Sequence, residues 1–121
     1  MKNFSSGDLR ISVNGMNGMG GRVRMMWNGR STDREPGRQL TPYFNGLLDE
    51  LEGRGLLISF QGLEYMNSST VTPIIQFLKN LNERNIETRV AYDGRSKWQR
   101  ASFRALSGLA MMMKHVTVEE A

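Results

Sequence analysis

The segment GLLISFQGLEYMNSSTVTPIIQFL (residues 55–78) points to an α/β fold, because a strand pattern and a helix pattern follow each other within it. Residues 55–60 form a short, continuous apolar run, which is typical of a central strand covered on both faces. From Pro73 onward, a helix is expected to run to residues 82–85, with its apolar positions at Ile74, Phe77, Leu78 and Leu81. Residues 61–72 lie between these two elements and are predicted to form a turn.

Upstream of this segment, two alternating stretches predict strands. In residues 8–13 and again in residues 22–27, apolar side chains occupy every second position, which is the period of a half-buried strand. The Asn-Gly and Gly-Gly steps of residues 14–21 permit the positive φ angles of tight turns, so these residues are predicted to form a hairpin loop. The first six or seven residues are expected to be a loose N-terminus.

A first helix is predicted after a polar loop at residues 30–40. Thr41 is a favoured N-cap type, and Pro42 suits the first helical position, where its missing N–H would in any case lack a partner. Gly53 is expected to end this helix. Its apolar positions recur at helical spacing and are Phe44, Leu47, Leu48 and Leu51.

Downstream, the same patterns predict a strand at residues 86–92, a helix over residues 96–109 and a short edge strand at residues 115–119. Ser96 can cap the helix. Its inward side chains are expected to be Trp98, Ala101, Ala105, Leu106 and Leu109. The resulting order of elements predicts an α/β sandwich, with a small mixed sheet of four to five strands and about three main helices.

Length and composition indicate one globular domain. With 121 residues, the chain can form one core of the usual domain size, so residues 1–121 are expected to be a single domain. Hydrophobic residues make up 39% of the chain, yet no apolar stretch approaches the roughly 20 residues that a membrane span needs. The chain opens with polar residues instead of a leader pattern and contains no cysteine. A cytoplasmic location without membrane association is therefore expected.

The charge balance is basic, with a formal net charge of +4 and a pI of about 9.9. Such a balance suits anionic partners when the basic residues cluster. The only dense group contains Arg95, Lys97, Arg100 and Arg104. No zinc-finger, RNP or helix-turn-helix signature accompanies this group, which argues against nucleic-acid binding.

Several catalytic chemistries lack the residues that they need. A metal centre is not expected, because the chain has a single His115 and no cysteine. The sequence around Ser68 has neither a GxSxG elbow nor an adjacent base, so a serine hydrolase is not expected either. The glycines of residues 15–21 do not match GxGxxG or GxxxxGK[ST], and no cofactor is predicted. These observations favour a binding protein over an enzyme.

The polar run Asn67–Thr70 comes directly after the apolar strand and its turn. Asn, Ser and Thr are preferred N-cap types, so capping alone would explain one of these four residues. Several hydroxyls would then lie at the end of the sheet where α/β proteins usually place their sites. A phosphate on one of them would meet the positive end of the helix dipole or add nearly two negative charges to a contact surface. The run is therefore a candidate switch.

The region from about Gly55 to Val118 resembles the STAS domain of SpoIIAA-like anti-sigma factor antagonists, in the turn GLEYMNSST and in its order of elements. The resemblance implies a STAS-like sandwich in which Ser68 is the regulatory phosphoacceptor, with Ser69 as the second choice. Asn67 stands where that family usually has an acidic residue, and Thr70 where it usually has glycine. An Asn before the hydroxyls is similar to the SiaC-like branch of biofilm phosphoproteins.

The resemblance also implies protein partners. These are a GHKL-type serine kinase or a kinase-like anti-sigma factor, a PP2C-type phosphatase and, in the SiaC-like branch, a diguanylate cyclase. The docking surface would surround the turn and the following helix. Its expected residues are Met66, Asn67, Ser68, Ser69, Thr70, Thr72, Gln76 and Lys79. Arg95, Lys97 and Arg100 are weaker candidates, because simple solvation explains them equally well.

Three functions stay open from the sequence. The first is a non-catalytic signalling module whose partner binding is switched by phosphorylation of Ser68. The second is a constitutive STAS interaction domain, or a SiaC-like activator of a diguanylate cyclase, without phospho-control. The third is a nucleic-acid-binding protein, which would show steeply salt-dependent binding.

Overall fold

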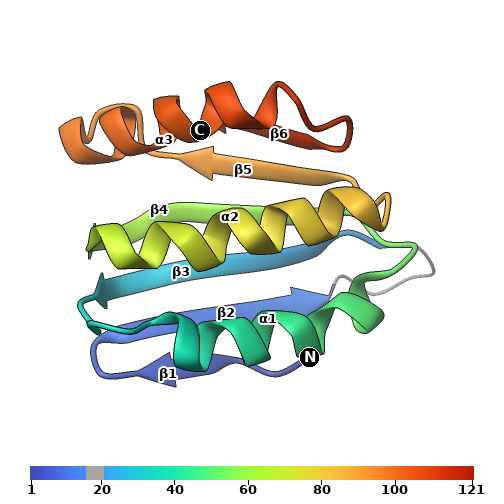
Figure 1. Ribbon diagram of the computed structural model, residues 1–121, viewed down its shortest axis with the longest axis horizontal. Coiled ribbons are helices and arrows are strands. Elements are labelled where there is room, and N and C mark those ends of the chain that lie inside the picture. Colours follow the sequence, from blue (N-terminus) through green and yellow to red (C-terminus); the bar gives the residue numbers. More distant parts are fainter. Residues whose placement is uncertain (16–20) are drawn as a thin grey trace.

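The computed structural model describes residues 1–15 and 21–121, and Figure 1 shows how their strands and helices are arranged. In chain order the elements are β1 (Phe4–Ser6), β2 (Leu9–Gly15), β3 (Val23–Ser31), α1 (Gly37–Leu51), β4 (Leu56–Met66), α2 (Ser68–Glu83), β5 (Thr88–Tyr92), α3 (Lys97–Ala110) and β6 (Val116–Glu120). The described strands form a six-stranded sheet in the order β1-β2-β3-β4-β5-β6. The strands β1, β2 and β3 are antiparallel neighbours, whereas β3 to β6 run parallel. The predicted α/β fold with three helices and a mixed sheet is confirmed, with six strands instead of four to five.

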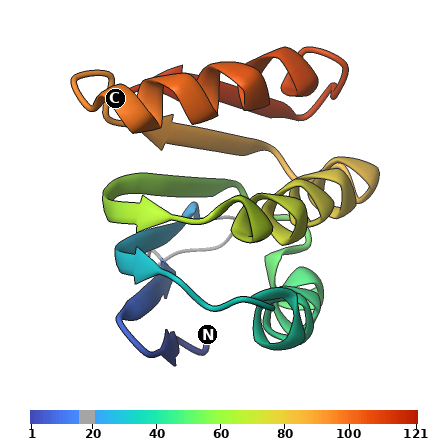
Figure 2. The same ribbon diagram turned by 60° about the vertical axis from the view of Figure 1, so that its left-hand side comes forward.

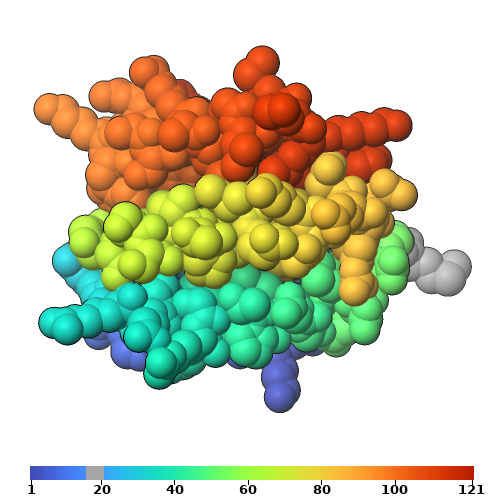
Figure 3. Space-filling model, in the orientation of Figure 1, coloured from blue at the N-terminus to red at the C-terminus, as the bar shows by residue number. Residues whose placement is uncertain are grey.

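All three helices cover the same face of the sheet. Each parallel connection contains one helix and moves one strand further along the sheet. Because such crossovers are right-handed, the three helices must lie on one side. Figures 1 and 2 show this layer, and in Figure 3 the helix α2 lies between α1 and α3. No described helix covers the opposite side, called the open face below, so the predicted cover on both faces of residues 55–60 is wrong.

Aromatic side chains join the sheet to its helices. The rings of Trp27 and Phe60, on neighbouring strands, lie 4.9 Å apart between their centroids. Phe44 of α1 stacks on Phe77 of α2 at 4.3 Å, and Phe60 contacts Phe103 of α3 at 4.7 Å. All five side chains are buried. Contacts of this kind add to the free energy gained from burial alone, and they fix the helices on the strands that carry the site.

The N-terminus is more ordered than the sequence predicted. Residues Phe4–Ser6 pair with β2 as an edge strand, in the register Phe4↔Ile11. The ring of Phe4 also packs against Tyr43 of α1, at 5.1 Å between centroids. The prediction of a loose start was therefore wrong, because strand pairing, the Phe4 ring contact and the bond from the Tyr43 hydroxyl to the Lys2 carbonyl hold this segment. Of the predicted hairpin loop at residues 14–21, residues 16–20 lie outside the described residues.

Helix α1 begins five residues earlier than predicted, because its first residue is Gly37 instead of Pro42 and its N-cap is Pro36 instead of Thr41. Leu40 is 1% exposed and extends the apolar stripe toward the N-terminus, which explains the earlier start. Pro42 consequently lies inside the helix, on an exposed position. The predicted loop at residues 30–40 is correspondingly short, since β3 also continues to Ser31.

The predicted turn at residues 61–72 is almost absent. Strand β4 continues to Met66, which pairs with Ser31 of β3, and helix α2 begins at Ser68. Asn67 is the single residue between the two elements. Two register shifts in the pairing with β3 interrupt the alternation of apolar residues, so the sequence pattern of a strand ends too early.

Helix α3 confirms the Ser96 N-cap, whose hydroxyl accepts a hydrogen bond from the backbone N–H of Gln99. The prediction of the inward residues of α3 was only partly correct. Leu106 is buried, and Trp98 and Leu109 are partly buried. Ala101 and Ala105 are exposed instead. The large ring of Phe103 turns toward the sheet, and the buried residues of the helix are Gln99, Phe103, Leu106 and Ala110. The last strand, β6, confirms the predicted edge strand within one residue.

Candidate functional site

Asn67 forms the corner between β4 and α2. Its backbone is extended, and its side-chain Oδ1 accepts from the backbone N–H of Thr70 at 3.1 Å and from the Thr70 hydroxyl at 2.7 Å. The side-chain Nδ2 donates to the carbonyl of Asp33 at 2.7 Å, and the backbone N–H donates to the carbonyl of Ser31 at 3.0 Å. Asn67 therefore caps α2 and at the same time bonds it to the end of β3 and the loop that follows.

Thr70 belongs to the interior and not to the surface. Its side chain is fully buried, and its hydroxyl lies 2.7 Å from the Ser31 hydroxyl. A partner protein cannot reach it in this state. The sequence-based assignment of Thr70 to the docking surface is therefore wrong, because the hydroxyl is used to satisfy buried polar groups.

Ser68 and Ser69 are the first two residues of α2, and both are exposed. Backbone N–H groups in the first turn of a helix have no partner within the helix, which favours an anion there. In the described part of the chain, no hydrogen bond occupies either hydroxyl. Both side chains also lie at the edge of the sheet where the parallel strands end, which is the usual site position in α/β proteins.

The other expected contact residues on α2 share one side of the helix. Thr72, Gln76 and Lys79 follow Ser68 at steps of four, four and three residues, and all are exposed. Gln76 donates to Asn80 on the same helix at 3.2 Å. Met66 is different, because it is only partly exposed and packs against the core. The structure thus brings Ser68, Ser69, Thr72, Gln76 and Lys79 together as a continuous exposed stripe, called the α2 stripe.

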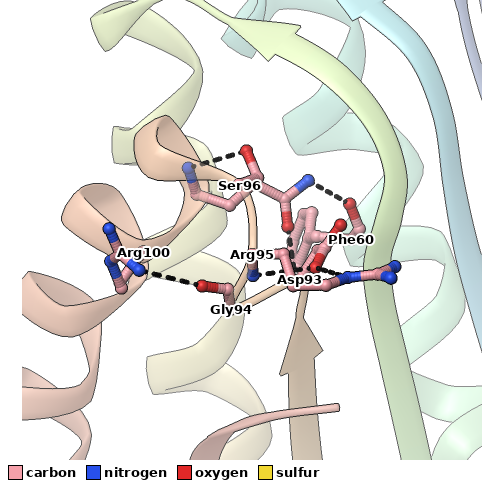
Figure 4. A network of polar contacts seen from close by, with 7 residues as sticks. Phe60, Asp93, Gly94, Arg95, Ser96 and Arg100 are labelled. Atoms are coloured by element: carbon pink, nitrogen blue, oxygen red, sulfur yellow. Dashed lines mark hydrogen bonds and ion pairs between the residues drawn. The ribbon is translucent and has the colours of Figure 1, made fainter.

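The three basic candidates lie around the turn between β5 and α3, and Figure 4 labels two of them, Arg95 and Arg100. Asp93 Oδ1 accepts from the backbone N–H of Arg95 at 2.9 Å and from its Nε at 3.3 Å. The backbone N–H of Arg95, followed by its side chain, holds the pKa of Asp93 below its usual value. Arg100 Nη1 donates to the carbonyl of Gly94 at 3.3 Å, and Lys97 is exposed at the start of α3. Arg95 and Arg100 therefore stabilise this turn, and no described contact links them to Ser68.

Gln99 is an important residue that the sequence-based prediction missed. Its side chain is 1% exposed, and Nε2 donates to the carbonyls of Phe60 at 2.7 Å and Leu63 at 2.8 Å. Its Oε1 accepts from the backbone N–H of Asp93 at 2.8 Å. These bonds satisfy strand carbonyls where the pairing of β4 with β5 has ended, as Figure 4 shows for Phe60. The helical spacing of Gln99 and Phe103 was the available signal, but an inward glutamine is rare.

A hollow of about 250 Å³ lies beside the cap. Its walls include Ser31 and Asp33, the two residues whose carbonyls Asn67 binds, together with Phe4, Leu9 and Leu40. The described residues contain no group of three or more His, Cys, Asp or Glu side chains placed to hold a metal ion. Likewise, none of the helices in the described part of the chain is long and apolar enough to cross a membrane.

Comparison with known proteins identifies the fold. No family model and no curated protein matches the chain. Among solved structures, an uncharacterized Shewanella loihica protein with a SpoIIAA-like fold superposes with a TM-score of 0.58 at 19% identity, over 98% of this chain and 92% of the other. The fold is SpoIIAA-like. This confirms the resemblance to STAS domains that the residues after Gly55 indicated.

Two further structures share the SpoIIAA-like fold. An anti-sigma factor antagonist from Mycobacterium paratuberculosis has a TM-score of 0.61 at 16% identity, over 94% of this chain and 90% of the other. The activator SiaC from Pseudomonas aeruginosa, solved in complex with the diguanylate cyclase SiaD, has a TM-score of 0.66 at 16% identity, over 100% of both chains. At such identities the similarity establishes the fold alone.

Proposed function

We propose that this protein is a non-catalytic signalling module whose binding to a partner protein is switched by phosphorylation of Ser68. One observation carries the proposal: the Ser68 hydroxyl is exposed and free of described hydrogen bonds at the first position of α2, beside a rigid cap. A kinase can reach such a hydroxyl. The α2 stripe continues from it and supplies a contact surface of ordinary polar residues.

The physical effect of the phosphate follows from its position. It would bring about two negative charges to the positive end of the helix dipole, where the first N–H groups lack helical partners. Because Asn67 already caps the helix, the phosphate is not needed for folding and is available to a partner. It would therefore change the charge of the surface around Ser68 while the backbone stays in place.

The surroundings of Ser68 favour binding over catalysis. In the described residues, no acid or base lies within hydrogen-bond reach of Ser68, and His115 pairs with Glu87 at the opposite edge of the sheet. We propose a GHKL-type kinase or a kinase-like anti-sigma factor as the phosphate donor, and a PP2C-type phosphatase to remove the phosphate. Support for these partners comes from the likeness to the anti-sigma factor antagonist.

Activation of a diguanylate cyclase is a second candidate output. It is favoured by the likeness to SiaC, which covers the whole of both chains, and by Asn67, which resembles the SiaC-like turn. In this version the unphosphorylated module would bind the cyclase, and phosphorylation would release it. Both candidates use the same switch and the same α2 stripe.

Intact-mass measurement and phosphopeptide mapping of the protein from its native cells test the switch. We expect one phosphate on Ser68, its loss in Ser68→Ala and its retention in Ser69→Ala. Ser68→Asp should weaken partner binding, whereas Thr41→Asp, which adds the same charge to an exposed position of α1, should not. Phosphate found only at other residues would contradict the proposal. If neither Ser68 variant changed partner binding, the constitutive interaction domain would be the correct interpretation.

A further inference from the structure

No described helix covers the open face of the six-stranded sheet. Sheets that are mainly parallel usually have both faces covered, because their strands are apolar on both sides. Here β3 to β6 are parallel and covered only by α1, α2 and α3. The face therefore has the architecture of a surface that a further layer would complete.

The register of the strands places defined side chains on this face. One row across the sheet contains Asn14, Arg24, Leu57, Arg89 and Thr117. The next row contains Ser12, Met26, Ser59, Ala91 and Glu119. A third row begins with Arg10, which pairs with Asn28. On β2 to β5 these positions alternate with buried residues of the helix-covered face, and Glu119 of β6 is placed on the open face by its pairing with Ala91.

The centre of the open face carries two large apolar side chains, Met26 and Leu57. Met26 is 36% exposed, which is high for a large apolar side chain, and Leu57 is partly exposed beside it. The neighbouring Ser59 is buried, and Ala91 is small and partly exposed. Met26, Leu57 and Ala91, with the buried Ser59 between them, form a mainly apolar strip across β3, β4 and β5, where a partner could bury apolar surface.

Arginines surround this strip. Arg10 and Arg24 are exposed, and no described acidic side chain pairs with them. Arg89 pairs with Glu119 at 3.1 Å, and Arg30 lies over the ring of Tyr65 at 5.2 Å at the edge of the face. The same face also carries Glu119 and the exposed Glu64 in the β4 bulge, while Glu87, two residues before Arg89, pairs with His115. The strip therefore has a basic border, which complements an acidic partner.

We propose that the open face is a second docking surface, which binds an acidic amphipathic helix of a partner protein. Leucine-type side chains of such a helix would lie on the strip of Met26, Leu57, Ser59 and Ala91, and its flanking carboxylates would bind Arg10, Arg24 and Arg89. A helix of about 16 residues is about 24 Å long, close to the width of six strands spaced about 4.8 Å apart. The complex would have a helix layer on each side of the sheet.

Two other occupants fit the face less well. A second copy of this chain would bring its own arginines against Arg10 and Arg24, and like charges in an interface are destabilising. Single-stranded nucleic acid needs exposed aromatic rings on which bases stack, but Trp27 and Phe60 point into the core, and Tyr65 lies at the edge beneath Arg30. A protein helix uses both the apolar strip and its basic border.

The proposal is independent of the switch, because Ser68 lies at an edge of the sheet and the strip lies on its open face. The module could therefore hold one partner on the open face while the α2 stripe exchanges another. Phosphomimetic substitution at Ser68 should leave binding at the open face unchanged within about twofold, since exposed charges a Debye length of about 8 Å or more apart are largely screened.

A designed peptide tests the proposal directly. The probe is a labelled amphipathic helix of about 16 residues, with leucines on one face and glutamates on both flanks. Its binding to the full chain is measured by fluorescence anisotropy and mapped by amide chemical shifts. We expect saturable binding, with shifts concentrated at residues 24–28, 57–61 and 89–91. A peptide with lysine in place of every glutamate should not bind.

Matched variants identify the surface. Arg10→Glu combined with Arg24→Glu should weaken peptide binding about tenfold or more, because two attractive contacts become repulsive. Met26→Gln should weaken binding through the apolar strip and changes no charge. Arg104→Glu, which reverses an exposed charge on α3, is the control and should change the affinity less than twofold. Circular dichroism confirms that each variant is folded.

Four results would overturn the proposal. The first is that the acidic peptide does not bind, and the second is that charge reversal at Arg10 and Arg24 leaves its affinity unchanged. The third is that a single-stranded oligonucleotide binds more tightly than the peptide and depends on the same arginines, which would assign the face to nucleic acid. The fourth is that sedimentation shows a dimer that Met26→Gln dissociates, which would assign it to a second copy of the chain.

Discussion

The hydroxyls of Ser31 and Thr70 lie 2.7 Å apart in a buried contact that joins the end of β3 to the first turn of α2. Thr70 uses its single hydroxyl proton to bond Asn67 Oδ1, which can only accept. The Ser31 hydroxyl must then donate to Thr70. Two successive hydrogen bonds, from Ser31 to Thr70 and from Thr70 to Asn67, therefore connect β3 to the N-cap of α2, the helix that carries Ser68.

Thr70→Val is expected to lower the free energy of unfolding by about 1 to 3 kcal/mol. The substitution keeps the shape of the side chain but leaves the buried Ser31 hydroxyl without its acceptor. Urea denaturation measures the change. Thr72→Val removes an exposed hydroxyl from the same helix and should change stability by less than about 0.5 kcal/mol. Equal effects of the two variants would show that the buried chain of bonds contributes nothing.

Asn67→Ala should be more destabilising than Asn67→Asp. Alanine removes both the cap and the bond to Asp33, with an expected loss of about 2 kcal/mol. Aspartate can still accept from Thr70 but cannot donate to the Asp33 carbonyl, so its loss should be smaller. This requirement for a donor gives a physical reason for Asn at this position. The hypothesis fails if aspartate is as stable as the native residue in thermal unfolding.

The sequence was sufficient for the fold because periodicity and caps are local. The alternation before Gly15, the Ser96 cap and the apolar stripe of α2 were each predicted and are present. The sequence pattern gave wrong predictions where contacts between distant parts of the chain determine the structure. Strand β1 depends on Phe4 packing against a helix some forty residues away, and the bulges of β4 conceal its length. Thr70 looked like a surface residue because nothing local shows that Ser31 lies opposite it.

The role of Gln99 could not be predicted for the same reason. Its side-chain partners are carbonyls of β4, far away in the sequence, and the unpaired state of those carbonyls depends on where β5 ends. Polar residues in helices are usually on the solvent side, so the alanines seemed the better choice for the interior. Only the completed sheet creates the requirement for a buried amide.

Gln99→Met should lower the free energy of unfolding by about 2 to 4 kcal/mol, because it fills a similar volume but leaves the Phe60 and Leu63 carbonyls and the Asp93 N–H unpaired. Chemical denaturation at neutral pH measures this loss. Gln76→Met, on the exposed side of α2, serves as the control and should be nearly neutral. A small effect at both positions would contradict the role assigned to Gln99.

Gln99→Glu adds a pH dependence to the same site. The carboxylate would face two carbonyl oxygens in a buried position, which raises its pKa in the folded state. Because the carboxyl pKa is higher in the folded state than in the unfolded state, the carboxyl group contributes stability below its unfolded pKa of about 4.3. This contribution is lost as the pH rises through the folded-state pKa. The variant should therefore be more stable near pH 4 than near pH 7, relative to the native protein. The prediction is wrong if the difference in unfolding free energy between the variant and the native protein is the same near pH 4 and near pH 7.

The raised pKa of Tyr43 predicts that the protein loses stability at alkaline pH. Burial, together with the negative charge of Glu50, raises the pKa of Tyr43 from 10.0 to about 12, and its hydroxyl donates to the Lys2 carbonyl at 2.7 Å. Because the folded pKa is the higher one, the contribution of Tyr43 is fully present below pH 10 and is lost as the pH rises toward 12. Denaturation curves of the native protein across this range should show the decline. In Tyr43→Phe the decline should be smaller, whereas Tyr65→Phe should retain it; a decline of equal size in all three proteins would mean that another group causes it.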